Sequence, residues 1–375
     1  MIKRAIIGSD IFDGQTLHAG KALLLDGDSF AGVADTNQIP KAYLTETLGP
    51  GTLMPGFVDL QVNGGGGVIF NDDTTVGGLR TIASAHATLG TKALLPTLIT
   101  DTPRKTRAAV DAVEAAIADA VPGIIGVHLE GPHLSVARKG AHDPALIRPM
   151  TAEDEEFLCD AARRLPNIMV TVAPENVTTS QISRLANAGV IVSLGHTDCS
   201  FAEAQSAFVA GACCVTHLFN AMSQLGNREP GLVGATLTTP NVSAGLIADS
   251  IHVHAADMQI AISSKPEPGR IFLVTDAMST VGSDIREFYL NGRRVRRENG
   301  RLALDDGTLA GADLDFPTAL TVLTQKVGIS KATAFAMATS YPARLLKDAM
   351  GFGTFEVGKT CNGVHIDLAN RCRPL

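Results

Sequence analysis

Two short apolar runs decide how this chain folds: Val190-Ile-Val-Ser-Leu-Gly-His196 and Cys213-Cys-Val-Thr-His217. Each has the length and apolar character of a buried strand, and each ends on a histidine. Two further runs, 124–130 and 271–276, end on a glutamate and an aspartate. Parallel α/β enzymes place their active sites at the carboxyl ends of their strands. We therefore expect these four polar side chains to share one site.

The middle of the chain alternates between strand patterns and helix patterns. Short apolar runs predict eight strands, at 56–62, 93–98, 124–130, 168–173, 190–196, 213–217, 242–248 and 271–275. Helical stretches separate them, with end signals such as Gly189, Gly211 and the capping-box spacing of Ser200 and Glu203. This rhythm predicts an α/β fold of the (β/α)8 TIM-barrel type. The lack of a strand–GxGxxG–helix unit disfavours a dinucleotide-binding sheet.

Both ends of the chain have β-like patterns with little helical periodicity. Short apolar runs in residues 1–50 are separated by Asp-Gly turns, and glycines punctuate residues 352–368. We therefore predict one small β domain built from residues 1–53 and 345–375, and a barrel domain over residues 54–344.

Composition and charge limit the class of protein. Of 375 residues, 45% are hydrophobic and 18% charged, which is typical of a globular protein with a large core. A net charge of −7 argues against a general nucleic-acid-binding protein. The six cysteines form no CxxC pair, which disfavours a cysteine zinc site and favours reduced thiols. No apolar run approaches the length of a membrane span and no signal peptide is evident, so we expect a cytoplasmic protein.

Two segments have both a functional and a structural interpretation. The glycine run 64–67 is suited to cradling a phosphate, but a turn is the expected interpretation. Residues 286–305 contain four arginines between the hairpin signals Asn291-Gly292 and Asn299-Gly300. A nucleic-acid patch is one interpretation, and we favour a solvated hairpin inserted after the eighth strand.

The strand-end residues suggest metal chemistry. Glu130, His196 and His217 make a three-ligand set, and catalytic zinc sites keep a fourth position for water, whose pKa the ion lowers. Asp276 is placed to take a proton from that water and return it to a leaving group. A lone strand-end histidine is usually a structural polar group, so the prediction rests on the four strands together. We interpret His86 and His128 as structural residues, and the role of His133 stays open.

Local motifs add a family resemblance that covers residues 50 to about 345. The motifs are Pro55-Gly-Phe-Val-Asp59, His128-Leu-Glu-Gly-Pro132, Leu194-Gly-His-Thr197, Thr216-His-Leu-Phe-Asn-Ala-Met222, Arg228-Glu-Pro-Gly231 and Val274-Thr-Asp-Ala277. Together they resemble the N-acetylglucosamine-6-phosphate deacetylases of the amidohydrolase superfamily. The first motif by itself marks only the superfamily, and the combination is specific.

The resemblance implies a distorted (β/α)8 barrel with a small β-sandwich from both termini. It implies hydrolysis of the acetamide of N-acetylglucosamine 6-phosphate to glucosamine 6-phosphate and acetate, in amino-sugar catabolism or recycling. Asp276 matches the family's catalytic base and acid, and Glu130, His196 and His217 match its metal ligands. The positions that match substrate-binding residues are His142, Asn220, Ala221, Arg228 and His252. Arg228 matches an arginine that reaches the neighbouring subunit's site, which implies a homodimer.

One departure concerns the number of metal ions. Many amidohydrolases have His-x-His after the first strand, where this chain has Gln61 and Asn63. Amide side chains are poor zinc ligands, so we expect one divalent ion, zinc, with iron, cobalt or manganese as alternatives. Gln61 is expected to hydrogen-bond near the metal or the substrate.

Three other functions are compatible with the same site residues. N-acetylgalactosamine 6-phosphate is an alternative substrate, because only the sugar pocket would change. A cyclic-amide or dipeptide hydrolase of the same superfamily and an inactive scaffold that binds other proteins are further alternatives. The scaffold is disfavoured because the ligand set and Asp276 are all present.

Overall fold

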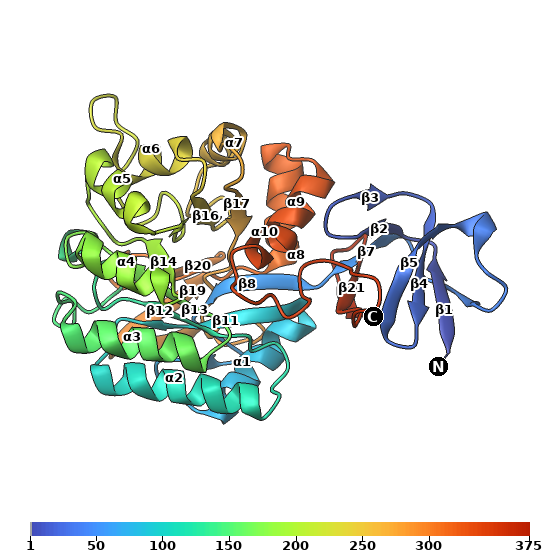
Figure 1. Cartoon of the computed structure of the whole chain (residues 1–375), viewed down its shortest axis with the longest axis horizontal. Coiled ribbons are helices and arrows are strands. Elements are labelled where there is room, and N and C mark those ends of the chain that lie inside the picture. Colours follow the sequence, from blue (N-terminus) through green and yellow to red (C-terminus); the bar gives the residue numbers. More distant parts are fainter. Residues whose placement is uncertain (1) are drawn as a thin grey trace.

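The computed structural model describes residues 2–375. Figure 1 shows a large α/β barrel beside a smaller domain made of strands, with both termini in the smaller domain. The predicted domain boundaries near residues 53 and 345 stay a prediction. Strand β7 (Gly51–Pro55), which spans the first of these positions, belongs to a sheet of the smaller domain.

Eight parallel strands form the barrel, in the order in which they occur in the sequence. They are β8 (Phe57–Val62), β11 (Thr91–Ile99), β12 (Val127–Glu130), β13 (Ile168–Val172), β14 (Ile191–Leu194), β15 (Cys214–Val215), β16 (Ser243–Leu246) and β17 (Ile271–Leu273). A parallel bridge between Val62 and Ala277 joins the last strand to the first, and the Asp276 amide donates to the Gln61 carbonyl at 3.0 Å. The predicted barrel is confirmed, and the predicted strands match these positions.

Helices follow the strands and cover the outside of the barrel (Figure 1). They are α1 (Val76–Thr88), α2 (Pro103–Ala118), α3 (Ala152–Arg164), α4 (Thr179–Asn187), α5 (Phe201–Ala210), α6 (Gly231–Thr238), α7 (Ala255–Ser264), α8 (Phe316–Thr321), α9 (Lys331–Ala338) and α10 (Ser340–Ala343). The capping box of Ser200 and Glu203 is formed at the start of α5, and Gly211 ends that helix with φ of 120°. These local signals fix the two ends of α5.

The small domain is a sandwich of two sheets. One contains β1 (Lys3–Ile7), β4 (Lys21–Asp26), β5 (Ser29–Asp35) and β6 (Leu44–Thr47); the other contains β7, β2 (Asp10–Phe12), β3 (Leu17–His18), β21 (Gly363–Asp367) and β22 (Cys372–Pro374). Both sheets contribute to one core, which includes Ile6, Leu23 and Leu53. The two ends of the chain therefore build one domain, as predicted.

A three-stranded sheet interrupts the barrel after β17. It consists of β18 (Glu287–Leu290), β19 (Arg293–Glu298) and β20 (Arg301–Leu304), with both predicted hairpin turns in place. One face of this sheet is buried against the barrel mouth, where Leu290 packs in a cluster with Met278. The prediction of a solvated hairpin is therefore right for one face only.

The four arginines of β19 are engaged within the chain. Arg294 pairs with Glu287, Arg296 with Asp305 and Arg297 with Asp313. The fourth arginine, Arg293, donates to the backbone carbonyl of Ala141. These partners favour the structural interpretation over a nucleic-acid patch.

The glycine run 64–67 is a tight hairpin, with β9 (Gly64–Gly65) paired to β10 (Val68–Ile69). The amides of Gly64, Gly66 and Gly67 donate to backbone carbonyls in residues 277–281 at 2.8–3.0 Å. Because these amides are already satisfied, the turn interpretation is correct and a phosphate cradle is not formed here.

The chain from residue 2 to residue 375 contains no helix with both the length and the apolar character needed to cross a membrane. All six cysteines are free thiols, as predicted.

Candidate active site

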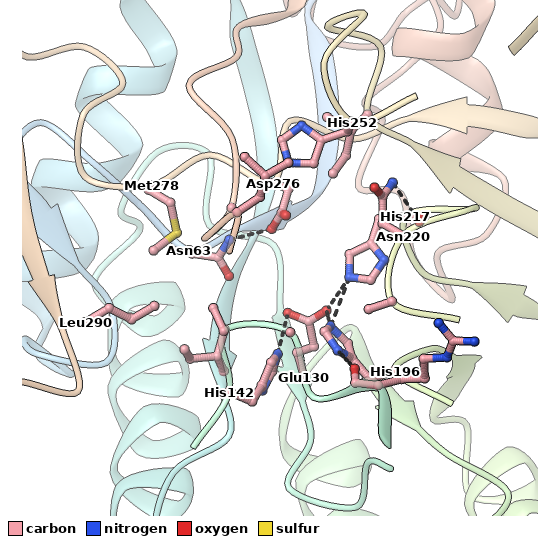
Figure 2. A pocket seen from close by; sticks show the side chains of 18 of the residues that line it. Asn63, Glu130, His142, His196, His217, Asn220, His252, Asp276, Met278 and Leu290 are labelled. Carbon is pink, nitrogen blue, oxygen red and sulfur yellow. Dashed lines mark hydrogen bonds and ion pairs between the residues drawn. The ribbon is translucent and has the colours of Figure 1, made fainter. Parts of the chain in front are cut away.

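The four strand-end residues meet in one cavity of about 330 Å³ at the mouth of the barrel. Glu130 is the last residue of β12, while His196 and His217 lie two residues beyond β14 and β15. Asp276 lies three residues beyond β17. Figure 2 shows the four side chains pointing toward one another. The expectation that they share a site is confirmed.

Three of these residues have left-handed backbone conformations. The φ angles are 48° at His196, 29° at His217 and 50° at Asp276. Residues other than glycine rarely adopt this region, which costs about 1–3 kcal/mol for each, and such residues cluster at functional sites. The barrel holds these side chains at the strand ends against a local preference, which supports a functional role.

The predicted metal ligands converge on a small space. His217 Nε2 lies 3.0 Å from Glu130 Oε1 and 3.1 Å from His196 Nε2, and His196 Nε2 lies 3.2 Å from the same carboxylate oxygen. Donor atoms bound to one tetrahedral zinc ion at about 2.0–2.1 Å are separated by about 3.3 Å. The set therefore fits one ion, by both its spacing and its nitrogen and carboxylate chemistry.

Hydrogen bonds also set the imidazole tautomers. His196 Nδ1 lies 2.8 Å from the Arg138 carbonyl, an acceptor only, so Nδ1 carries the proton and Nε2 presents a lone pair. His217 Nδ1 is buried and has no hydrogen-bond partner in residues 2–375. His217 can therefore adopt the same tautomer as His196, with its proton on Nδ1. In the neutral rings these two Nε2 lone pairs face each other and favour a cation between them, whereas a protonated ring donates from Nε2 to Glu130 Oε1 instead.

The predicted ligands shift one another's pKa values in opposite directions. Burial raises the pKa of Glu130, but hydrogen bonds from His196 and His217 outweigh burial and hold that pKa well below its usual range. Burial lowers the pKa of His217, but the hydrogen bond and charge of Glu130 raise it overall. Glu130 is therefore an ionised carboxylate, the form that binds a cation.

A second grouping replaces His217 with His142. Donor atoms of Glu130, His142 and His196 lie within 4.8 Å of one another. However, the Thr100 amide donates to His142 Nδ1 at 3.3 Å, and the Thr100 hydroxyl, 2.8 Å from the same nitrogen, can donate to it as well, which favours the proton on Nε2. Burial, with the nearby His196, lowers the pKa of His142 to about 3, so the ring stays neutral. His142 therefore suits hydrogen-bond donation into the cavity better than metal binding.

Asp276 lies across the cavity from the histidines. Asn63 Nδ2 donates to its Oδ1 at 2.6 Å, and Gln61 Nε2 donates to the same oxygen at 3.1 Å. Burial, followed by the charge of Glu130, raises the pKa of Asp276 to about 6. A carboxyl group with a pKa near neutrality can both accept and return a proton.

Gln61 is buried beneath the cavity and links its two carboxylates. Its Nε2 also donates to Glu130 Oε1 at 3.2 Å. The expected hydrogen bond near the metal site is therefore present, whereas a substrate contact stays a prediction. Asp59, in the same strand, accepts the Thr275 hydroxyl at 2.5 Å and so holds the turn before Asp276.

Other predicted substrate residues line the cavity away from the ligand triad. Asn220, Ala221 and His252 border it together with an apolar wall that includes Met278 and Leu290. His252 Nδ1 contacts Asp249 Oδ2 at 2.5 Å, which orients the ring. Burial raises the pKa of Asp249, but His252 holds it below its usual range. Sequence reasoning missed Asp249, although its spacing of three residues from His252 is a usable signal.

Arg228 does not line the cavity of its own chain. It is exposed in the segment between β15 and α6, part of which projects from the barrel in Figure 1. Three histidines that were not assigned to the site have hydrogen-bond partners of their own. His86 contacts the Gly64 carbonyl, His128 the Thr171 hydroxyl and His133 the Arg148 carbonyl. The structural interpretations of His86 and His128 are supported, and His133 joins them.

Comparison with known families decides the class of protein. The model of the Amidohydrolase family matches residues 52–373, which is most of the chain. The chain belongs to the amidohydrolase family. Membership of this family implies a divalent metal ion, in agreement with the spacing of the Glu130, His196 and His217 donor atoms.

Individual amidohydrolases resemble the chain over most of their length. An N-acetylgalactosamine-6-phosphate deacetylase of Shewanella sp. (strain ANA-3) is 43% identical, with 84% of this chain and 79% of the relative covered. An N-acetylglucosamine-6-phosphate deacetylase of Haemophilus influenzae is 32% identical, with coverages of 96% and 94%. The crystal structure of N-acetylglucosamine-6-phosphate deacetylase from Pasteurella multocida is similar with a TM-score of 0.93, 33% identity, and coverages of 99% and 97%.

Proposed function

We propose that this protein hydrolyses the acetamide of N-acetylglucosamine 6-phosphate to glucosamine 6-phosphate and acetate. The observation that carries the proposal is the cavity in which Glu130, His196 and His217 converge opposite Asp276. The names of the similar amidohydrolases support the substrate class, since they act on N-acetylated amino-sugar phosphates.

Glu130, His196 and His217 would hold one divalent ion, and zinc is the ion we propose, with iron, cobalt or manganese as alternatives. When bound, such an ion lowers the pKa of a water molecule and polarises a carbonyl group. Amide nitrogens of Gln61 and Asn63 both point to Asp276 Oδ1, and Gln61 also donates to Glu130. Amide side chains are poor zinc ligands, so Gln61 and Asn63 at these positions support the assignment of a single ion.

Asp276 and His142 would handle the proton and the developing charge. Asp276 accepts a proton from the attacking water and returns it to the nitrogen as the carbon–nitrogen bond breaks. Because Gln61 and Asn63 occupy Oδ1, Oδ2 is the oxygen left to exchange the proton. The proton on His142 Nε2 is available to the carbonyl oxygen, which gains negative charge as the carbon becomes tetrahedral.

We assign the phosphate of the substrate to residues that line the cavity away from the predicted metal ligands. The backbone amide of Ala221 and the ring of His252 can donate hydrogen bonds to sugar and phosphate oxygens. Asn220 Nδ2 donates to the carbonyls of His217 and Leu218 at 3.2 and 3.3 Å, and it would exchange one of these bonds for the substrate. Arg228, exposed and outside its own cavity, would reach the phosphate in the neighbouring subunit of a homodimer. Its planar guanidinium suits bidentate phosphate binding.

N-acetylgalactosamine 6-phosphate is a second candidate substrate. The Shewanella relative named for that substrate is 43% identical to this chain, above the 32% of the Haemophilus relative named for the glucosamine epimer. The two sugars differ only at one hydroxyl, so the metal chemistry and Asp276 would serve both. Free thiols support a reducing compartment, and we assign the reaction to the cytoplasm.

The test is acetate release from four substrates by protein of known metal content: both epimers, each with and without the 6-phosphate. The proposal predicts the highest kcat/KM for N-acetylglucosamine 6-phosphate and large losses without phosphate. Preference for the galactosamine epimer would transfer the function to the second candidate. If metal-loaded protein released acetate from neither sugar phosphate, the result would contradict both candidate functions.

A further inference from the structure

The two polar atoms of the Asn63 side chain have different surroundings. Asn63 Nδ2 donates to Asp276 Oδ1 at 2.6 Å. Asn63 Oδ1 is buried and accepts no hydrogen bond from residues 2–375. The residue is 2% exposed and lines the cavity, so this acceptor lies beside the place where a substrate would bind. Figure 2 shows the amide oxygen turned away from Asp276.

The charge of Asp276 fixes the orientation of this amide. Reversing it would place Asn63 Oδ1 2.6 Å from a carboxylate oxygen, and two acceptors at that distance repel each other. Gln61 cannot relieve the repulsion, because its Nε2 already donates to the same oxygen of Asp276. The unpartnered atom of Asn63 is therefore the oxygen.

A buried acceptor without a donor costs about 1–3 kcal/mol, so this oxygen favours a ligand that brings a donor. The proposed substrate offers an amide N–H and sugar hydroxyls. The nitrogen must lie within reach of Asp276, because that group returns the proton to it. Asn63 is hydrogen-bonded to Asp276, so the scissile N–H is the donor placed beside Asn63 Oδ1.

We propose that Asn63 Oδ1 accepts a hydrogen bond from the N–H of the scissile acetamide; this inference rests on the proposed function. As water adds to the carbonyl carbon, the nitrogen becomes pyramidal and gains a lone pair. Anchoring its N–H to Asn63 leaves the lone pair to face Asp276. Asp276 then transfers the proton that it took from water, the carbon–nitrogen bond breaks, and Asn63 exchanges no proton.

Gln61 supplies a matched control for the contact with Asp276. Gln61 and Asn63 both donate to Asp276 Oδ1, but only Asn63 lines the cavity. Gln61→Met and Asn63→Ala therefore both weaken the support of Asp276, whereas only Asn63→Ala removes an acceptor for the substrate. The substrate pair to compare is the N-acetyl sugar phosphate and its oxygen analogue, in which an acetate ester replaces the acetamide and no N–H exists.

In metal-loaded protein, Asn63→Ala should lower kcat/KM for the acetamide about tenfold more than for the ester, the effect of one hydrogen bond. Gln61→Met should lower both by the same factor. Equal losses on the two substrates in Asn63→Ala would overturn the inference, as would loss of bound metal, which would make Asn63 a ligand. Absence of acetamide hydrolysis in the wild-type holoenzyme would instead refute the proposed function itself.

A crystal structure gives a readout independent of turnover. In the metal-loaded Asp276→Asn variant with N-acetylglucosamine 6-phosphate bound, the acetamide nitrogen should lie within about 3.2 Å of Asn63 Oδ1. A complex in which that oxygen contacts the metal ion or a sugar hydroxyl would overturn the inference.

Discussion

His196 Nε2 and His217 Nε2 lie 3.1 Å apart although their residues are 21 positions apart in the sequence. Both atoms also approach Glu130 Oε1, so the three atoms are spaced to hold one cation. The histidines extend from adjacent strands, β14 and β15, each in a left-handed backbone conformation.

Replacing His217 with alanine should remove metal binding. The variant leaves Glu130 and His196 as two ligands, too few for a stable zinc site. Elemental analysis should find about one ion in the wild-type chain and little in the variant, with activity lost in parallel. His133→Ala, at a buried histidine outside the cavity, is the control and should keep its metal. Full metal content in His217→Ala would contradict the ligand assignment.

Asp276→Asn should separate metal binding from catalysis. The amide cannot carry the proton, so turnover should fall by roughly 10²–10⁴-fold while the metal stays bound. Acetate release and metal content measured on one preparation check this. Activity near that of the wild type would contradict the role of Asp276.

The pH profile of the wild-type enzyme should show the same group. Burial and Glu130 raise the pKa of Asp276 to about 6, and a bound cation would lower it again. The base works only when ionised, so kcat/KM should rise with pH and level off by about pH 6–7. A profile that is flat down to pH 4, with metal retained, would argue against Asp276 as the base.

Arg228→Met should affect phosphorylated substrates selectively. The variant keeps the length of the side chain and removes the guanidinium, so kcat/KM for the 6-phosphate should fall while that for the unphosphorylated sugar changes little. Mixed dimers of Arg228→Met and Asp276→Asn chains should regain part of the activity if the arginine acts across the interface. Equal losses on both substrates would count against a phosphate contact.

The Arg148–Asp154 pair predicts a pH-dependent contribution to stability. The two nitrogens of Arg148 contact both carboxylate oxygens at 2.5 and 2.7 Å. Burial raises the pKa of Asp154, but Arg148 and Thr151 outweigh it and lower the pKa below its usual value of 3.8. A lowered pKa stabilises the folded state above the unfolded pKa, and the contribution is lost as pH falls through the folded pKa.

Arg148→Met should therefore lower the free energy of unfolding by about 1 kcal/mol at pH 7, and the difference should shrink below about pH 4. Urea unfolding at several pH values measures it. Arg163→Met is the control, because its partner Asp160 is about half exposed and the change should be near zero. If the difference in the free energy of unfolding stayed the same at acidic pH, packing rather than charge would be responsible.

The sequence predicted the barrel and the four strand-end residues well because their signals are local. Apolar runs, the Ser200–Glu203 capping box and the Asn-Gly turns each act over a few residues. Helix α6 was not predicted. It contains Gly231 and Gly234 and is almost fully buried, so tertiary packing overrides a low helix propensity.

Contacts between distant segments were beyond the sequence patterns. Asn63 and Asp276 are 213 positions apart, and only closure of the barrel brings Asn63 Nδ2 to Asp276. Leu290 likewise enters the cavity from an inserted sheet whose buried face no alternation pattern had identified. The roles of these residues became visible only with the fold.

Titration of metal-free protein with zinc, with acetate release from N-acetylglucosamine 6-phosphate as the readout, tests the central claim most directly. Glu130, His196 and His217 provide one site, so activity should rise linearly and reach its plateau at one ion per chain. A plateau only at two ions, or an ion bound at this site without acetate release, would contradict the account.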